Sequence, residues 1–216
     1  MHRNLINNTI FFVKQQLHGA EGGHDWFHIE RVYKNALLIA KAEDCDLRVV
    51  QLGALLHDIA DSKFHNGDET IGPKTARQFL ESQNVKEETI SHVIKIIENI
   101  SYKGGNFEKQ FTSKELDIVQ DADRLDALGA IGIARTFNYG GFKNRTLYDP
   151  AISPNLSMSK ETYKNSESPT LNHFYEKLLL LSSKMNTETG KKLAGQRHQF
   201  METFLTQFYA EWNGEQ

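Results

Sequence analysis

The sharpest local signal in the chain is the sequence Leu55-Leu56-His57-Asp58-Ile59-Ala60-Asp61. It closes a run of helical periodicity that extends from about Asp46 to Ile59. An imidazole and a carboxylate therefore stand side by side where an apolar helix leaves the core. Burying a carboxylate without a partner is costly, so this pair needs a cation, a hydrogen-bond donor or a metal ion. Taken alone, a His-Asp dipeptide favours an ordinary helix end that is satisfied by neighbouring backbone.

Helical periodicity continues on both sides of this sequence. No segment shows a convincing alternation of apolar and polar residues, which is the pattern of a β-strand. Upstream, one helix covers about residues 5–17 and a second starts near His24. Downstream, Pro73 suits the first turn of the next helix. Further helices are expected at about 86–101, 113–138, 169–184 and 188–212. These patterns predict an all-α fold.

One segment, residues 140–169, is rich in Gly, Asn, Ser and Pro and shows little periodicity. It is long for a loop inside a compact domain, so it is either a flexible excursion or a lid over a site. No linker separates two cores, which favours a single compact domain. The expected organisation over residues 1–216 is a metal-binding core at about 20–135, the loop or lid at 140–169 and C-terminal helices at 169–212.

The composition is that of an ordinary globular protein, with 39% hydrophobic and 25% charged residues. The formal net charge of −3 argues against binding of duplex nucleic acid through its phosphates. A single cysteine, Cys45, excludes an intrachain disulfide framework. The polar start does not resemble a signal peptide, and no apolar run is long enough to span a bilayer. We therefore expect a cytoplasmic protein without a membrane partner.

Two further segments place polar residues among helical, apolar ones: His24-Asp25-Trp26-Phe27-His28 and Gln120-Asp121-Ala122-Asp123-Arg124-Leu125-Asp126. His24 and His28 are four residues apart, a spacing that puts both rings on one face of a helix. Asp123 shares a stripe with small apolar residues, so it is expected to face the core and to need a neutralising partner. Asp121 has Arg124 within one turn and is expected at the surface.

In their order and helical context, these residues resemble the HD-domain superfamily of metal-dependent phosphohydrolases. The flanking sequences look like the stand-alone bacterial YedJ/YpgQ-like subgroup, and they include Ser101-Tyr102-Lys103-Gly104-Gly105 and His173-Phe174-Tyr175-Glu176-Lys177-Leu178. The likeness thus covers nearly the whole chain. It implies a helical HD-domain bundle with additional C-terminal helices.

The resemblance also implies one divalent metal ion, held by His28, His57, Asp58 and Asp123. Two nitrogens and two carboxylate oxygens suit Mn, Fe, Co, Ni or Zn better than calcium. Mn or Mg is the expectation for phosphate substrates, with Fe, Co, Ni or Zn as alternatives. Binuclear members carry further histidines before the last aspartate. Ser101 stands near where such a histidine would be sought, which favours one metal.

Four further residues are candidates for catalysis. Asp61 lies one helical turn beyond His57 and is the leading general acid or base, with a solvated helix end as the alternative. Lys103, which precedes two glycines, is the candidate ligand for substrate phosphates. His24 and Asp25 are candidates for orienting His28 or the attacking water.

The substrate class is narrowed by the residues after the His-Asp pair. Hydrolases of guanosine tetraphosphate typically carry a Glu-Asp pair where this chain has Asp61 and Ser62, so the second acid is missing. The resemblance points to cleavage of nucleoside triphosphates into a monophosphate and pyrophosphate. A nucleoside monophosphate phosphatase, a phosphodiesterase and a non-catalytic metal- or nucleotide-binding sensor stay open. The expected partner is a small phosphate compound, a nucleotide in the first place, and a homodimer is compatible with the sequence.

Overall fold

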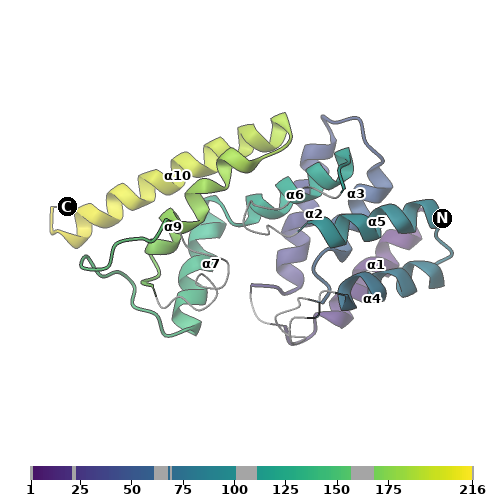
Figure 1. Cartoon of the computed structure of the whole chain (residues 1–216), viewed down its shortest axis with the longest axis horizontal. Coiled ribbons are helices and arrows are strands. Elements are labelled where there is room, and N and C mark those ends of the chain that lie inside the picture. Colours follow the sequence, from purple (N-terminus) through teal and green to yellow (C-terminus); the bar gives the residue numbers. More distant parts are fainter. Residues whose placement is uncertain are drawn as a thin grey trace. The chain divides into compact units, whose positions relative to one another are not determined.

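A computed structural model describes residues 2–20, 23–60, 68, 70–100, 111–156 and 168–215. Within these ranges the regular structure is helical and contains no strand (Figure 1), so the predicted all-α class is confirmed. The α-helices are α1 (His2–Gln16), α2 (Trp26–Ala40), α3 (Leu47–Leu56), α4 (Ile71–Ser82), α5 (Glu87–Asn99), α6 (Lys114–Asp126), α7 (Gly129–Phe142), α9 (Asn172–Glu176) and α10 (Glu188–Trp212). None of the helices described is both long and apolar enough to cross a membrane.

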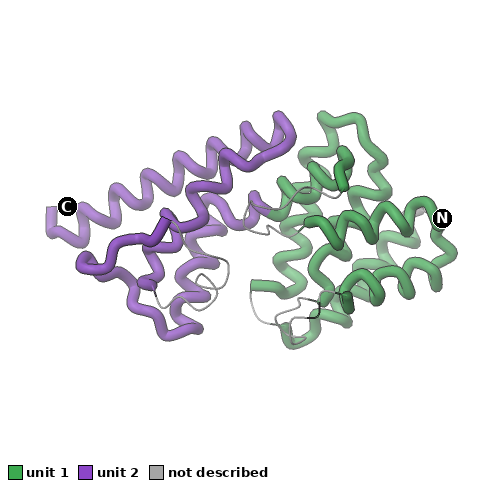
Figure 2. The backbone as a smooth tube through the Cα atoms, viewed as in Figure 1, with its two compact units in different colours: residues 1–123 green, residues 124–216 purple. Residues whose placement is uncertain are grey.

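The chain divides into two compact units, residues 1–123 and 124–216 (Figure 2). Helix α6 belongs to both, because the division falls between Asp123 and Arg124. The expectation of one domain over the whole chain stays a prediction.

Helix α3 is the centre of the first unit and lies against α1, α2 and α5, while α4 packs on α5. It begins after Asp46, whose carboxylate accepts hydrogen bonds from the backbone NH groups of Arg48 and Val49. Leu52 and Leu55 are both fully buried. Burial of each such side chain contributes about 1.5–3 kcal/mol. The His-Asp pair that follows α3 therefore stands on the best-buried helix of the unit.

The helix expected over 113–138 is wrong as a single element, because the chain breaks between α6 and α7. Gly129 has a φ of +69°, a left-handed conformation that glycine adopts without strain. A Cβ atom on Gly129 would lie only 3.1 Å from Cβ of Arg197 in α10. The helical spacing of apolar residues continues through this break, so that spacing alone did not predict the break.

The second unit is held by an aromatic core between α7, α9 and α10. The ring of Phe204 lies 5.9 Å from that of Phe137 and 5.7 Å from that of Phe174. The helix predicted over 188–212 is confirmed, whereas the one predicted over 169–184 is interrupted after α9 by two short 3₁₀ turns, η2 (Leu178–Leu180) and η3 (Ser182–Lys184).

The segment expected as a loop or lid, residues 140–169, is described at 140–156 and 168–169. Its first residues still belong to α7, which ends at Phe142. The ring of Tyr148 lies 5.9 Å from that of Phe208 and 4.9 Å from that of Trp212, both on α10. Residues 157–167 of this segment lie outside the described ranges.

Candidate metal centre

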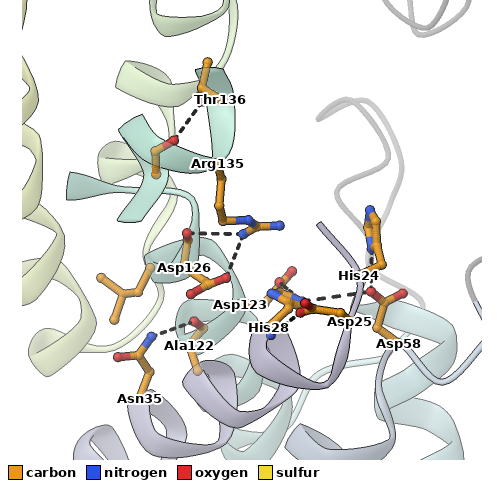
Figure 3. A network of polar contacts seen from close by, with 12 residues as sticks. His24, Asp25, His28, Asn35, Asp58, Ala122, Asp123, Asp126, Arg135 and Thr136 are labelled. Atoms are coloured by element: carbon orange, nitrogen blue, oxygen red, sulfur yellow. Dashed lines mark hydrogen bonds and ion pairs between the residues drawn. The ribbon is translucent and has the colours of Figure 1, made fainter. Parts of the chain in front are cut away.

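Side chains that are far apart in the sequence meet in the first unit, and Figure 3 shows three of them, His28, Asp58 and Asp123. His28 comes from α2, His57 and Asp58 from the turn after α3, and Asp123 from α6. His28, His57 and Asp58 each offer a ligand atom, and these atoms lie within 4.8 Å of one another. Oδ1 of Asp123 is 3.5 Å from Nε2 of His28 and 3.8 Å from Nε2 of His57. The group with mutually close ligand atoms thus comprises His28, His57 and Asp58, and Asp123 lies near its two histidines.

The imidazole ring of His57 is oriented by a hydrogen bond to a backbone carbonyl group. Its Nδ1 lies 2.9 Å from the carbonyl oxygen of Ala54. A carbonyl oxygen only accepts, so Nδ1 carries the proton and the lone pair of the neutral ring is on Nε2. That Nε2 atom is buried and has no hydrogen-bond partner among the described residues. An orphaned buried acceptor is costly, and a metal ion would satisfy it.

Asp58 is held by a histidine from outside the metal-binding set. Nδ1 of His24 lies 2.6 Å from Oδ2 of Asp58. Burial raises the pKa of the Asp58 carboxyl, but the hydrogen bond to His24 and the nearby imidazoles of His57 and His28 bring that pKa below its ordinary value. Asp58 is therefore ionised at neutral pH, as a metal ligand must be.

The first turn of α2 is fixed by Asp25. Its carboxylate caps the helix and accepts a hydrogen bond of 3.0 Å from the backbone NH of His28. Helix α2 begins at Trp26, so the prediction that His24 and His28 share one helical face is wrong. The two rings are nevertheless close, with their centroids 6.1 Å apart, because the chain turns back before the cap.

On helix α6, the structure reverses the burial that the sequence predicted for Asp121 and Asp123. Asp121, expected at the surface, is fully buried, whereas 37% of the side-chain surface of Asp123 is exposed. The prediction for these two aspartates assumed that α6 buries only one of its faces. Ile118, Val119 and Ala122 are all at 0% exposure, however, and together they cover most of the circumference of the helix. The carbonyl of Ala122 also accepts from Asn35 of α2, at 3.4 Å, which ties α6 to the helix that carries His28 (Figure 3).

Two of the predicted catalytic residues, Asp61 and Lys103, lie outside the described residues, as does Ser101. His92, between the His-Asp pair and Asp123, is engaged elsewhere. Its Nε2 is 2.9 Å from the hydroxyl of Ser113 and 3.4 Å from a carboxylate oxygen of Glu115.

Comparison with known proteins agrees with this geometry. The protein YpgQ of Bacillus subtilis is 37% identical over 199 residues, which cover 91% of this chain and 88% of that protein. A family model described as the HD domain matches residues 26–128, a range that contains all four converging side chains. The chain belongs to the HD-domain family. The expectation of an HD-type hydrolase is thereby confirmed, since solved relatives are named as hydrolases of this superfamily.

Solved HD-domain structures extend the likeness over the full length. An HD-superfamily hydrolase from Bacillus thuringiensis is 45% identical, covers 99% of both chains and superposes with a TM-score of 0.79. B. subtilis YpgQ in complex with ADP is 32% identical, covers 97% of this chain and 96% of that one, and has a TM-score of 0.75. HD domains bind divalent metal ions, and His28, His57 and Asp58 are grouped here as possible ligands of such an ion.

Proposed function

We propose that this HD-domain protein is a metal-dependent phosphohydrolase that cleaves nucleoside triphosphates to a monophosphate and pyrophosphate. The observation that carries the proposal is the convergence of His28, Asp58 and Asp123 around the orphaned Nε2 of His57. The nucleotide part is supported by YpgQ, which was crystallised with ADP. Conversion to a monophosphate and pyrophosphate rests on the sequence resemblance.

In this proposal one divalent ion is held by His28, His57, Asp58 and Asp123. The donor set fits such an ion, because it combines imidazole nitrogens with carboxylate oxygens and leaves one buried nitrogen without a hydrogen-bond partner among the described residues. When bound, the ion would supply Lewis-acid activation of water and neutralise charge on a phosphoryl oxygen. Mn or Mg is the expected ion.

The chain's own residues prepare this site. The carbonyl of Ala54 fixes the tautomer of His57, so that Nε2 is free of a proton. His24 holds Oδ2 of Asp58, which also lies 3.9 Å from Nε2 of His28. Asp25 fixes the backbone at His28 by capping α2. In this proposal His24 and Asp25 act by orienting residues that hold the ion.

Proton transfer and phosphate binding are proposed for residues outside the described ranges. Asp61 is the candidate that protonates the leaving oxygen, because it is an acid that stands four residues after His57 in the sequence. Lys103 is the candidate that contacts the leaving pyrophosphate.

The proposal is tested by incubating the protein and Mn²⁺ with a panel of nucleoside tri-, di- and monophosphates and separating the products by chromatography. We expect intact pyrophosphate and a nucleoside monophosphate from triphosphates. Free phosphate as the only product would indicate a phosphomonoesterase, and cleavage of diesters alone a phosphodiesterase. Saturable nucleotide binding without any product would indicate a sensor.

A further inference from the structure

The proposed ligand Asp123 stands in the last turn of its helix. Helix α6 ends at Asp126, so residues 123–126 make up that turn. The last carbonyl groups of a helix have no partner within it, and this turn frays unless other groups cap it. Asp123 is also the most exposed of the four proposed ligands, so its own burial does not hold it in place.

Two arginines reinforce a backbone cap, in which the NH groups of Ala127 and Leu128 donate to the carbonyls of Arg124 and Leu125 at 3.1 and 3.2 Å. Nη1 of Arg135, from α7, donates to the backbone carbonyl of Asp126 at 3.2 Å. Nη1 of Arg197, from α10, donates to the carbonyl of Leu125. Cations at this end of a helix are also favoured by the negative end of the helix dipole.

The side chain of Asp126 strengthens this cap. Only 1% of Asp126 is exposed, and its Oδ2 accepts from Nη1 of Arg135 at 2.7 Å (Figure 3). One guanidinium nitrogen thus binds both the backbone and the side chain of the same residue. A carboxylate buried to this extent needs cations nearby, and Arg135 contacts it directly at the end of α6.

We propose that Asp126 and Arg135 are positioning residues for the metal centre, which hold the last turn of α6 so that Asp123 stays beside His28 and His57. The proposal rests on the proposed metal site and adds residues that never touch the ion. Asp126 and Arg135 are nine residues apart and lie on opposite sides of the break between α6 and α7. The proposal gives this pair a role.

The test is Mn²⁺ affinity, measured by isothermal titration calorimetry at 25 °C on the wild-type chain and on Asp126→Asn and Arg135→Met. Residues that orient metal ligands typically contribute about 10- to 100-fold in affinity, and we expect losses of that order. Arg135→Lys retains a cationic donor and should recover part of the affinity. With saturating Mn²⁺, the turnover of Asp126→Asn should approach that of the wild type, because the ligand set is intact.

Phe204→Leu is the matched control, since it loosens the aromatic core of the same unit. It should lower the melting temperature and leave Mn²⁺ affinity unchanged. Wild-type affinity in both Asp126→Asn and Arg135→Met, or an equal loss in Phe204→Leu, would overturn the proposal. A wild-type chain that binds no Mn²⁺ would instead overturn the proposed function.

Hydrogen exchange on the unaltered protein tests the cap without any variant. The amides of residues 123–126 should exchange more slowly than those of residues 209–212, which end α10 without an arginine cap among the described contacts. Equal exchange at the two helix ends would show that the arginines do not hold the last turn of α6.

Discussion

Nδ1 of His24 lies 2.6 Å from Oδ2 of Asp58, so a residue that precedes helix α2 orients a carboxylate at the end of helix α3. The ionised carboxylate can only accept, which makes His24 the donor. This bond joins two of the sequence segments that first indicated a metal site, and it lies beside the orphaned nitrogen of His57.

Asp58→Ala should remove the metal and the activity together, because it deletes a charged ligand from the centre of the site. Elemental analysis after dialysis measures the first effect, and the nucleotide assay measures the second. Asp44→Ala, which changes an exposed acid of the same unit, should leave both unchanged. Stoichiometric metal in Asp58→Ala would show that the ligand assignment is wrong.

Asp61→Asn should retain the metal and lose turnover. The amide keeps the shape of the side chain but does not transfer the proton, so kcat should fall by about 10²- to 10⁴-fold. Metal content and kcat measured on the same preparation separate this role from ligation. Turnover near that of the wild type would make Asp61 a solvated helix end.

Lys103→Ala should impair triphosphates far more than monophosphates, because only the former carry negative charge on a leaving pyrophosphate. A charge-assisted contact of this kind contributes about 1.5–3 kcal/mol, or about 10- to 100-fold in kcat/KM. The ratio of kcat/KM values for the two substrate types is the measurement. Equal losses on both types would make Lys103 a structural residue.

His173 should make the free energy of unfolding depend on pH. Burial, with the charges of Lys177 and Arg145, lowers the pKa of His173 to about 3 from its ordinary value of 6.5. The unfolded chain therefore binds a proton below pH 6.5 that the folded chain rejects, so this contribution is complete above pH 6.5 and is lost as the pH falls toward 3.

In urea titrations, the loss of unfolding free energy between pH 7 and pH 5 should be smaller in His173→Asn than in the wild type by about 1–2 kcal/mol. His18→Asn, at an exposed position, should follow the wild type. Parallel pH dependence of wild type and His173→Asn would contradict the assignment.

Gly129→Ala should destabilise the protein by about 1–3 kcal/mol, because alanine is strained at positive φ. The added methyl would also meet the side chain of Arg197 at 3.1 Å. Gly195→Ala is the matched control, since it lies inside α10 with no atom within 4 Å of its Cβ position. It should raise the unfolding free energy by up to about 1 kcal/mol, and a similar loss in both variants would contradict the argument.

Much of the site could be predicted from the sequence, because its elements follow local rules. Apolar spacing indicated the all-α class and the approximate position of most helices. The order of His28, His57-Asp58 and Asp123 indicated the family, and these side chains do meet. The helix break at Gly129 escaped prediction because a glycine with positive φ can occur within apolar periodicity that is otherwise continuous.

Local chemistry along the chain thus determined the all-α class, most helix positions and the candidate metal ligands, since these follow from patterns that reach only a few residues. Tertiary packing decided how those residues are used. It buried Asp121 and left Asp123 partly exposed, it gave Asp58 the histidine His24 as its partner, and it paired Asp126 with Arg135. Burial and ion pairing depend on which separate helices come together, and periodicity within one helix does not contain that information.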